Sequence, residues 1–297
     1  MDIGVILPTG VPDVEGRTVL DWARRADAGP FSTIAAVDRL NYGNLDPMLT
    51  LASVAGVTER ARLMSYVVIP GLRGAAVFAK EAATLSVLAP GRVSLGLGIG
   101  ARPSDYAVAG VDWSRRGKVL DEHLDALMAL QDRPDREQGL GPDLGDVEVI
   151  IGGASPPALA RLVKHGHGYC HGGVMPEIFG YEVAAVHGAW QGAGKAGKPR
   201  IVASTWYASG EQLRPRASAW MDAYFVQGAP PEPIRDVVHY GREEVRETIR
   251  TFAAAGADEV VLFPCVSDVS ELEWLADVVA DLAVPAPSDA AAQPAAV

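Results

Sequence analysis

Cysteine is scarce in this sequence of 297 residues, which contains only Cys170 and Cys265. Their spacing matches no metal-ligand motif, and two cysteines do not make a disulfide framework. The sequence therefore predicts no metal site and fits a reducing compartment. We expect both thiols to be small side chains of the core.

Basic residues and long apolar runs are also in short supply. The 26 Lys and Arg residues are outnumbered by 37 Asp and Glu residues, which gives a formal net charge of -11. Nucleic acid is not expected as the main partner, because no excess of positive charge would neutralise its phosphates. No apolar segment reaches the roughly 18 residues that cross a bilayer, and the first ten residues lack the basic start and apolar run of a secretion signal. We expect a cytoplasmic protein without a membrane partner.

Short apolar runs alternate with longer helical patterns along the whole chain, which is typical of βα units with parallel strands. Eight strands are predicted, at residues 3–8, 33–38, 62–69, 92–98, 147–151, 168–172, 200–207 and 259–263. Nine helices are predicted, at residues 17–28, 46–57, 74–89, 113–131, 156–165, 176–191, 211–226, 241–255 and 269–282. Eight sequential units favour an α/β fold, a (β/α)8 TIM barrel; the alternative, an open doubly wound sheet, needs a topological switch and usually fewer strands.

Two helix starts are the firmest boundaries in the sequence. Asp46 precedes Pro47 and Ser155 precedes Pro156. Each pair is predicted to place a capping side chain before a proline at the first helical position.

The domain organisation follows from composition. Residues 132–146 are rich in Asp, Gly and Pro and are predicted to form a loop, and the Ala/Pro-rich residues 285–297 are predicted to be a disordered tail. No linker divides the rest, so residues 1–284 are predicted to form a single domain.

The reactive groups of such a barrel stand at the carboxyl ends of its strands. Asp38 lies where the second apolar run becomes charged, and a carboxylate there can position a substrate or transfer a proton. An ion pair with Arg39 or another cation at the rim is the alternative role for Asp38. His171 is the histidine at a rim position, although a lone histidine is more often structural. We take Asp38, Arg39 and His171 as the candidate catalytic residues.

Glycines gather at two of these strand ends. In the segment from Gly96 to Arg102, three glycines would let a flat ligand or a phosphate approach the backbone, although a tight βα turn explains them equally well. The segment from Gly152 to Ser155 places two glycines before a helix whose free N–H groups and positive dipole end would hold a phosphate. The alternative is that these glycines only pack the strand-helix turn.

The sequence also lacks the familiar catalytic motifs. It contains no G-x-S-x-G nucleophile motif and no G-x-x-x-x-G-K-[ST] phosphate loop. Glycine-lined rims with few acid-base pairs suggest that a bound cofactor supplies the reactivity.

Three segments carry a resemblance to a known family. They are Lys80 to Val93, Leu95 to Gly100, and Val111 to Glu122. Together they resemble the bacterial luciferase-like family of flavin- and deazaflavin-dependent oxidoreductases, and the resemblance runs from residue 3 to about residue 280. It implies a TIM barrel that binds FMN or the deazaflavin coenzyme F-420 above its strand ends.

The resemblance also implies roles for individual residues. Asp38 matches the family's acidic residue after the second strand, where many deazaflavin members carry a following histidine in place of Arg39. The expected cofactor contacts are Asp38, a strand-three bulge that is often a non-proline cis peptide (Tyr66, Val67 and Val68), the cleft residues Gly98, Gly100, Arg102 and Ser104, and the phosphate neighbours Gly152, Gly153, Ala154, Ser155, Gly172 and Gly173.

The leading hypothesis is a coenzyme F-420-dependent oxidoreductase that moves a hydride to or from a small organic substrate. Asp38, Arg39 or His171 would orient the substrate and handle a proton. One alternative is an FMN-dependent monooxygenase that receives reduced flavin from a separate reductase and reacts with oxygen. The other is a binding subunit that keeps the barrel without catalysis. Barrels of this family commonly pair, so we expect a homodimer.

Overall fold

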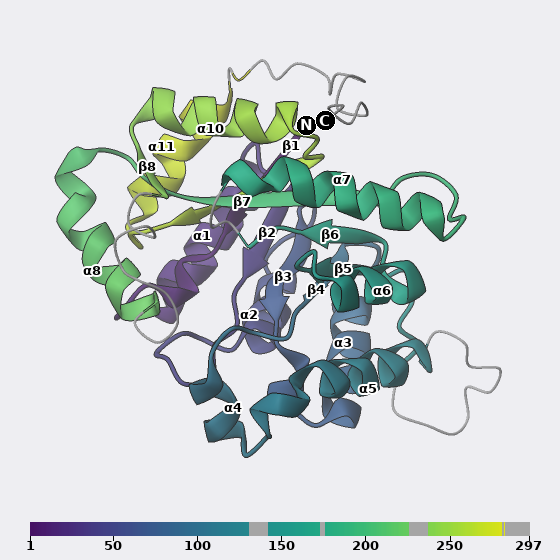
Figure 1. Cartoon of the computed structure of the whole chain (residues 1–297). Coiled ribbons are helices and arrows are strands. Elements are labelled where there is room, and N and C mark those ends of the chain that lie inside the picture. Colours follow the sequence, from purple (N-terminus) through teal and green to yellow (C-terminus); the bar gives the residue numbers. More distant parts are fainter. Residues whose placement is uncertain (131–141, 173–175, 226–236, 281, 283–297) are drawn as a thin grey trace, which may run out of the picture.

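The computed structural model describes residues 1–130, 142–172, 176–225, 237–280 and 282. Within these ranges the strands form one parallel sheet, and eight of them close into a barrel because β6 pairs with β7 and β9 pairs with β1 (Figure 1). The barrel strands, in order around the ring, are β1 (Asp2–Ile6), β2 (Thr33–Ala36), β3 (Arg62–Val68), β4 (Val93–Leu97), β5 (Glu148–Gly152), β6 (Gly168–Cys170), β7 (Arg200–Ala208) and β9 (Glu259–Pro264). The predicted (β/α)8 TIM barrel is confirmed.

A short additional strand was not predicted. β8 (Val238–Tyr240) pairs with the end of β7, from Trp206 to Ala208, on the edge opposite β9. Three residues are too few for a period of two to stand out in a sequence. β8 therefore lengthens the barrel wall beyond the end of β6.

Helices surround the barrel (Figure 1). They are α1 (Gly16–Ala28), α2 (Pro47–Ala55), α3 (Ala75–Leu88), α4 (Pro103–Ala109), α5 (Arg116–Met128), α6 (Pro156–His165), α7 (Pro176–Gly192), α8 (Arg214–Phe225), α10 (Arg242–Ala254) and α11 (Val269–Ala280), with 3-10 turns at Pro8–Gly10, Pro70–Leu72, Trp113–Arg115 and Glu211–Leu213. All nine predicted helices are present, and α4 adds to them. None of the helices in the described ranges is long and apolar enough to cross a membrane.

The two predicted helix caps have different outcomes. Asp46 caps α2, because its carboxylate accepts a hydrogen bond from the Leu49 N–H at 3.0 Å. Ser155 occupies the capping position of α6, but the prediction that its hydroxyl caps the helix is wrong. Prolines fill the first two positions of α6, so Ala158 is the first residue with an N–H to offer.

Two other predictions fall largely outside the described residues. These are most of the loop at 132–146 and the tail at 285–297. The single domain at 1–284 stays a prediction.

Side chains of each strand alternate between two apolar layers. Along β9, Val260 and Leu262 join the large outer cluster beneath the helices, whereas Val261 and Phe263 join the inner cluster. The inner cluster also contains Trp220 of α8, whose indole donates a hydrogen bond to Gly10 O at 2.5 Å, just beyond β1. α8 therefore packs across the carboxyl end of the barrel.

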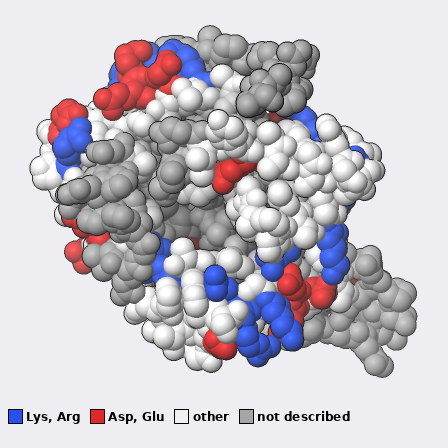
Figure 2. All heavy atoms as spheres, viewed as in Figure 1, with Lys and Arg blue, Asp and Glu red and all other residues white. Residues whose placement is uncertain are grey.

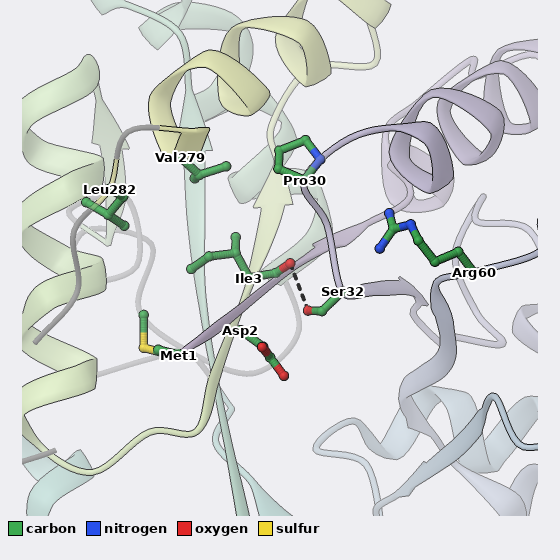
Figure 3. Close-up of a pocket in the computed structure, with 8 residues that line it drawn as sticks. All are labelled: Met1, Asp2, Ile3, Pro30, Ser32, Arg60, Val279 and Leu282. Atoms are coloured by element: carbon green, nitrogen blue, oxygen red, sulfur yellow. Dashed lines mark hydrogen bonds between the residues drawn. The ribbon is translucent and has the colours of Figure 1, made fainter. Parts of the chain in front are cut away.

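The amino end of the barrel holds buried charges that balance one another. Arg200 of β7 forms ion pairs with Glu148 of β5 and with the fully buried Glu259 of β9. A cavity of ≈ 240 Å³ lies beside this end, at the start of β1, where Ser32 donates a hydrogen bond to Ile3 O (Figure 3). In barrels of this type the amino end serves stability, so the functional site is sought at the opposite end.

Candidate functional site

A cavity of ≈ 550 Å³ opens at the carboxyl ends of the barrel strands. Ten of the predicted site residues line it: Asp38, Tyr66, Val67, Gly98, Gly100, Arg102, Gly152, Gly153, His171 and Gly172. The face in Figure 2 is hollowed near its centre, and the described atoms around the hollow are mostly uncharged. A site of this kind suits a ligand with a large apolar surface.

The remaining predicted residues lie elsewhere. Arg39, Val68, Ser104, Ala154 and Ser155 are not among the residues that line the cavity. Gly173 lies outside the described residues.

The floor of the cavity is an irregular part of β3. The pairing of β3 with β4 shifts register between Ser65 and Val68, and the peptide bond between Tyr66 and Val67 is cis. On β4 and just after it, the positions that face this bulge have no room for a side chain. A Cβ on Gly98 would lie 2.8 Å from Val67 Cγ2, and one on Gly96 would lie 2.2 Å from Ser65 O. These two glycines therefore make room for the bulge of β3.

Other glycines border open space instead. No described atom lies within 4 Å of a Cβ built on Gly153 or Gly172. Gly153 also has a φ of +85°, a backbone angle that residues other than glycine rarely adopt. The backbone of these residues is accessible from the cavity, as close approach of a ligand requires.

Asp38 is buried and forms an ion pair with Arg73, another cation at the rim, and not with the adjacent Arg39. Arg73 donates to both carboxylate oxygens, at 2.6 and 3.3 Å, and the Ile69 N–H donates at 2.9 Å. Burial raises the pKa of Asp38 above its usual value, although Arg73 and the Ile69 N–H act in the opposite direction. The carboxylate is thus fixed in place and has few lone pairs left for a ligand.

Arg39 turns away from Asp38. Its Nε donates to Asp105 at 3.1 Å, and a terminal nitrogen donates to Tyr224 O at 2.6 Å. Asp105 also accepts the N–H groups of Leu40 and Asn41, so it organises the loop after β2. This geometry gives Arg39 a structural task, and its catalytic role stays a prediction.

His171 is anchored on the outer side of β6. Its ring packs against Phe179 of α7 at 5.3 Å between centroids, and its Nδ1 lies 2.7 Å from Glu182 Oε2. The Tyr169 hydroxyl donates to the same oxygen at 2.5 Å. Since Cys170 belongs to the inner cluster, the alternation of β6 places its neighbour His171 on the opposite face. Its catalytic role also stays a prediction.

Glu182 lines the cavity and was missed by sequence reasoning. Burial alone would raise its pKa, but hydrogen bonds from His171 and Tyr169 lower the pKa below its usual value. It is therefore a stable carboxylate at neutral pH. Nothing in the helical pattern of α7 distinguishes this glutamate from an exposed one.

The upper wall of the cavity is aromatic and was also missed. Trp206 of β7 stacks on Phe263 of β9 with 6.0 Å between ring centroids, and Phe225 of α8 meets Trp206 edge-on at 5.8 Å. All three line the cavity, together with Tyr224. Such a wall excludes water from the strand ends.

The predicted phosphate site stays a prediction. Gly152 and Gly153 line the cavity, but Pro156 and Pro157 leave the first turn of α6 without its first two N–H groups. The predicted anion site therefore depends on the remaining N–H groups and the helix dipole.

Neither thiol nor metal chemistry is evident in the described part of the chain. Cys170 lines the cavity, but burial raises its pKa to about 12, so it is a neutral thiol at physiological pH. No cluster of three or more His, Cys, Asp or Glu side chains there could hold a metal ion.

The family can now be assigned. A family model described as luciferase-like monooxygenase matches residues 1–283. The chain belongs to this luciferase-like family. The resemblance recognised in the sequence is thereby confirmed. An uncharacterized protein of Mycobacterium tuberculosis is 29% identical to this family member over 163 residues, which are 51% of this chain and 56% of the relative. The chain thus spans about half the length of the curated relatives it matches.

Solved structures of luciferase-like enzymes share this fold. An F420-dependent secondary alcohol dehydrogenase, in complex with an F420-acetone adduct, has a TM-score of 0.75 and 19% identity, covering 95% of this chain and 99% of that chain. The oxygenating constituent of 3,6-diketocamphane monooxygenase from Pseudomonas putida, in complex with FMN, has a TM-score of 0.71 and 17% identity, covering 96% and 99%. At these identities the likeness shows the fold alone.

Proposed function

We propose that the protein is a coenzyme F-420-dependent oxidoreductase that moves a hydride to or from a small organic substrate. The observation that carries the proposal is the ≈ 550 Å³ cavity, which has a bulged floor at Tyr66 and Val67 and an aromatic wall. Membership of the luciferase-like family supports oxidoreductase chemistry. The likeness to an F420-dependent alcohol dehydrogenase is compatible with this cofactor.

The cavity fits a planar ring with a charged tail. Val67 lies beside Gly98 and Gly152, and a Cβ on either glycine would approach Val67 or the neighbouring backbone. Gly153 and Gly172 leave open space where the tail would leave the ring. When bound, the deazaflavin supplies the carbon that gives or takes the hydride, so the protein itself needs no strong acid-base pair.

The chain's own residues would position the reactants. Tyr66 is locked because its hydroxyl donates to His171 O at 2.6 Å, and this bond fixes the floor against β6. Trp206, Phe225 and Phe263 would keep water away from the reacting carbons. Asp38, held in place by its ion pair with Arg73, would orient the substrate. In this proposal Arg39 and His171 stabilise the carboxyl end of the barrel.

The predicted cofactor contacts form two groups. Tyr66, Val67, Gly98, Gly100, Gly152, Gly153 and Gly172, with Asp38, line the cavity and are proposed to contact the cofactor directly; Arg102 also lines the cavity, and its cofactor contact stays a prediction. Val68, Ser104, Ala154 and Ser155 lie outside its lining, and together with Gly173 they stay predictions.

Titration of the purified protein tests the choice of cofactor. We expect coenzyme F-420 to bind with a dissociation constant at least about tenfold lower than that of FMN, followed by absorbance and by quenching of tryptophan fluorescence. Trp206 lines the cavity, so its emission should respond. Tight FMN binding without deazaflavin binding would reject the proposal.

An FMN-dependent monooxygenase is the second candidate, because an FMN-bound member of the family has nearly the same TM-score. It would take reduced FMN from a separate reductase, and oxygen consumption with reduced FMN would favour it. A binding subunit without catalysis is the third candidate. Turnover with either reduced cofactor would eliminate it.

We also propose that the protein is a cytoplasmic homodimer. α2 and α3 pack side by side and expose apolar side chains, among them Leu49 (70% exposed) and Val77 (58% exposed). We propose that these exposed apolar side chains belong to the dimer interface. Light scattering at micromolar concentration should give twice the mass of 31.2 kDa, and L49D should shift it to the monomer mass. A wild-type monomer at that concentration would remove the idea.

A further inference from the structure

A group of aromatic and charged side chains meets at the end of α8, beside the cavity. We call it the Tyr224 corner, and it comprises Arg39, Tyr42, Arg102 and Tyr224. The guanidinium groups of Arg39 and Arg102 lie 5.2 and 5.1 Å from the centre of the Tyr224 ring, and the Tyr42 ring meets it edge-on at 5.3 Å. The corner joins the loops after β2 and β4 to α8.

The charges in the Tyr224 corner do not balance. Both arginines donate to Tyr224 O, at 2.6 and 2.9 Å, but only Arg39 has a carboxylate partner, Asp105. No described carboxylate lies within ion-pairing distance of Arg102. Burial lowers the pKa of Arg102, and the nearby Arg39 acts in the same direction, although Tyr224 and Asp105 act in the opposite direction. By contrast, the half-buried Arg73 and Arg200 each pair with more than one carboxylate.

Polar atoms in and beside the corner also lack hydrogen-bond partners. Arg102 Nε, Ser104 Oγ and the Tyr42 hydroxyl are all buried and have no hydrogen-bond partner in the described part of the chain. A guanidinium group can only donate, so Arg102 needs an acceptor. A buried donor without an acceptor destabilises the folded protein. The missing component is a group that accepts hydrogen bonds and carries negative charge.

Arg102 faces the cavity, so a ligand there can supply this group. Two carboxylates also line the cavity. The charge of Asp38 is neutralised by Arg73. Glu182, which lies on α7 beyond β6, keeps its negative charge and would repel the negative end of a ligand. These charges favour one orientation of a ligand, with its negative end at Arg102 and its apolar body along Trp206 and Phe263.

We propose that Arg102 binds the carboxylate or phosphate of an otherwise apolar substrate. The planar guanidinium suits such groups because it can donate two parallel hydrogen bonds. This proposal rests on the proposed function only in taking the cavity as the substrate site. It adds a class of substrate, an amphipathic anion, and makes Arg102 the residue that selects it.

Calorimetric titration with matched probes tests the proposal on the protein without cofactor. The probes are hexanoate, hexyl phosphate and 1-hexanol, which share an apolar chain and differ in charge. We expect one of the anions to bind at least about tenfold more tightly than 1-hexanol, and R102Q to abolish this preference. R216Q is the control, since Arg216 lies on α8 but pairs with Asp268 in an exposed position. Equal binding of anions and alcohol by the wild-type protein would overturn the proposal, and so would a preference that survives in R102Q.

Two further measurements complete the test. If R102Q fails to fold, R102K is tested instead, because lysine keeps the positive charge but cannot donate two parallel hydrogen bonds from one planar group. An unchanged preference for the anions in R102K would contradict the proposal. The same titration is repeated with protein saturated with coenzyme F-420, or with FMN if that binds instead. It shows whether the anion that Arg102 binds belongs to the substrate or to the cofactor. A preference lost on saturation would assign Arg102 to the cofactor tail and overturn the substrate assignment. Loss of coenzyme F-420 binding with the preference intact would contradict only the proposed function.

Discussion

Replacing Arg73 with alanine is expected to lower the free energy of unfolding by about 3–5 kcal/mol at pH 7.5, because a buried carboxylate would lose its partner. Asp38 has only 3% of its side chain exposed, and its remaining partner is the Ile69 N–H. Part of the loss reflects the second ion pair of Arg73, with Asp46. Denaturant unfolding measured by circular dichroism gives the value.

The loss should depend on pH in a defined direction. Burial already raises the pKa of Asp38, and removal of Arg73 would raise it further. A carboxyl group whose pKa is higher in the folded chain stabilises the fold while protonated, and this stability is lost as the pH rises through the folded pKa. The penalty of R73A should therefore shrink between pH 7.5 and pH 5.

Two variants serve as controls for R73A. D38N in the R73A background should recover much of the lost stability at pH 7.5, since a neutral amide needs no counter-charge. R24A should change the unfolding free energy by less than about 0.5 kcal/mol, because Arg24 and Asp21 form an exposed pair. An R73A penalty that is constant with pH and unaffected by D38N would show that Asp38 is not the cause.

Replacing Gly172 with leucine is expected to weaken cofactor binding at least about a hundredfold, which is about 2.7 kcal/mol. Gly172 lines the cavity, and a Cβ there meets no described atom within 4 Å. The side chain can therefore be accommodated in the free protein, but it would occupy the space proposed for the ligand. The readout is the same fluorescence titration, together with thermal unfolding of the cofactor-free variant.

The matched control for G172L is G188L. Gly188 lies on the exposed face of α7, where a Cβ also meets open space. We expect it to leave cofactor binding unchanged and to raise stability slightly, because glycine is a poor residue within a helix. Unchanged binding in G172L with an intact fold would place the ligand elsewhere in the cavity.

The fold could be predicted because its signals are local. Eight apolar runs separated by helical patterns define the barrel, and Asp46 before Pro47 marks a helix start that the structure confirms. The missed elements, α4 and β8, are short segments of seven and three residues. The predicted cap at Ser155 is wrong because its hydroxyl accepts no hydrogen bond from the first turn of α6, where the proline at position 157 removes one of the two N–H groups that such a cap could use.

The site was less predictable because its contacts join distant segments. The partner of Asp38 is Arg73, which is 35 residues away, and not the adjacent Arg39. The aromatic wall comes from β7, α8 and β9, where single tryptophan and phenylalanine residues look like ordinary core residues. The position of each residue along its strand could be inferred from the sequence. Which charged side chains pair with one another at the carboxyl end of the barrel depends on the tertiary structure.

The placement of α8 has an evolutionary consequence. The bulge of β3 and the glycines of β4 and β5 belong to the barrel wall, whereas Tyr224 and Phe225 come from α8, in the connection between β7 and β8. Replacement of that one connection would change the aromatic wall of the cavity without disturbing the glycines and the bulge of the barrel strands. Divergence among relatives of this chain should therefore concentrate in the β7–β8 connection.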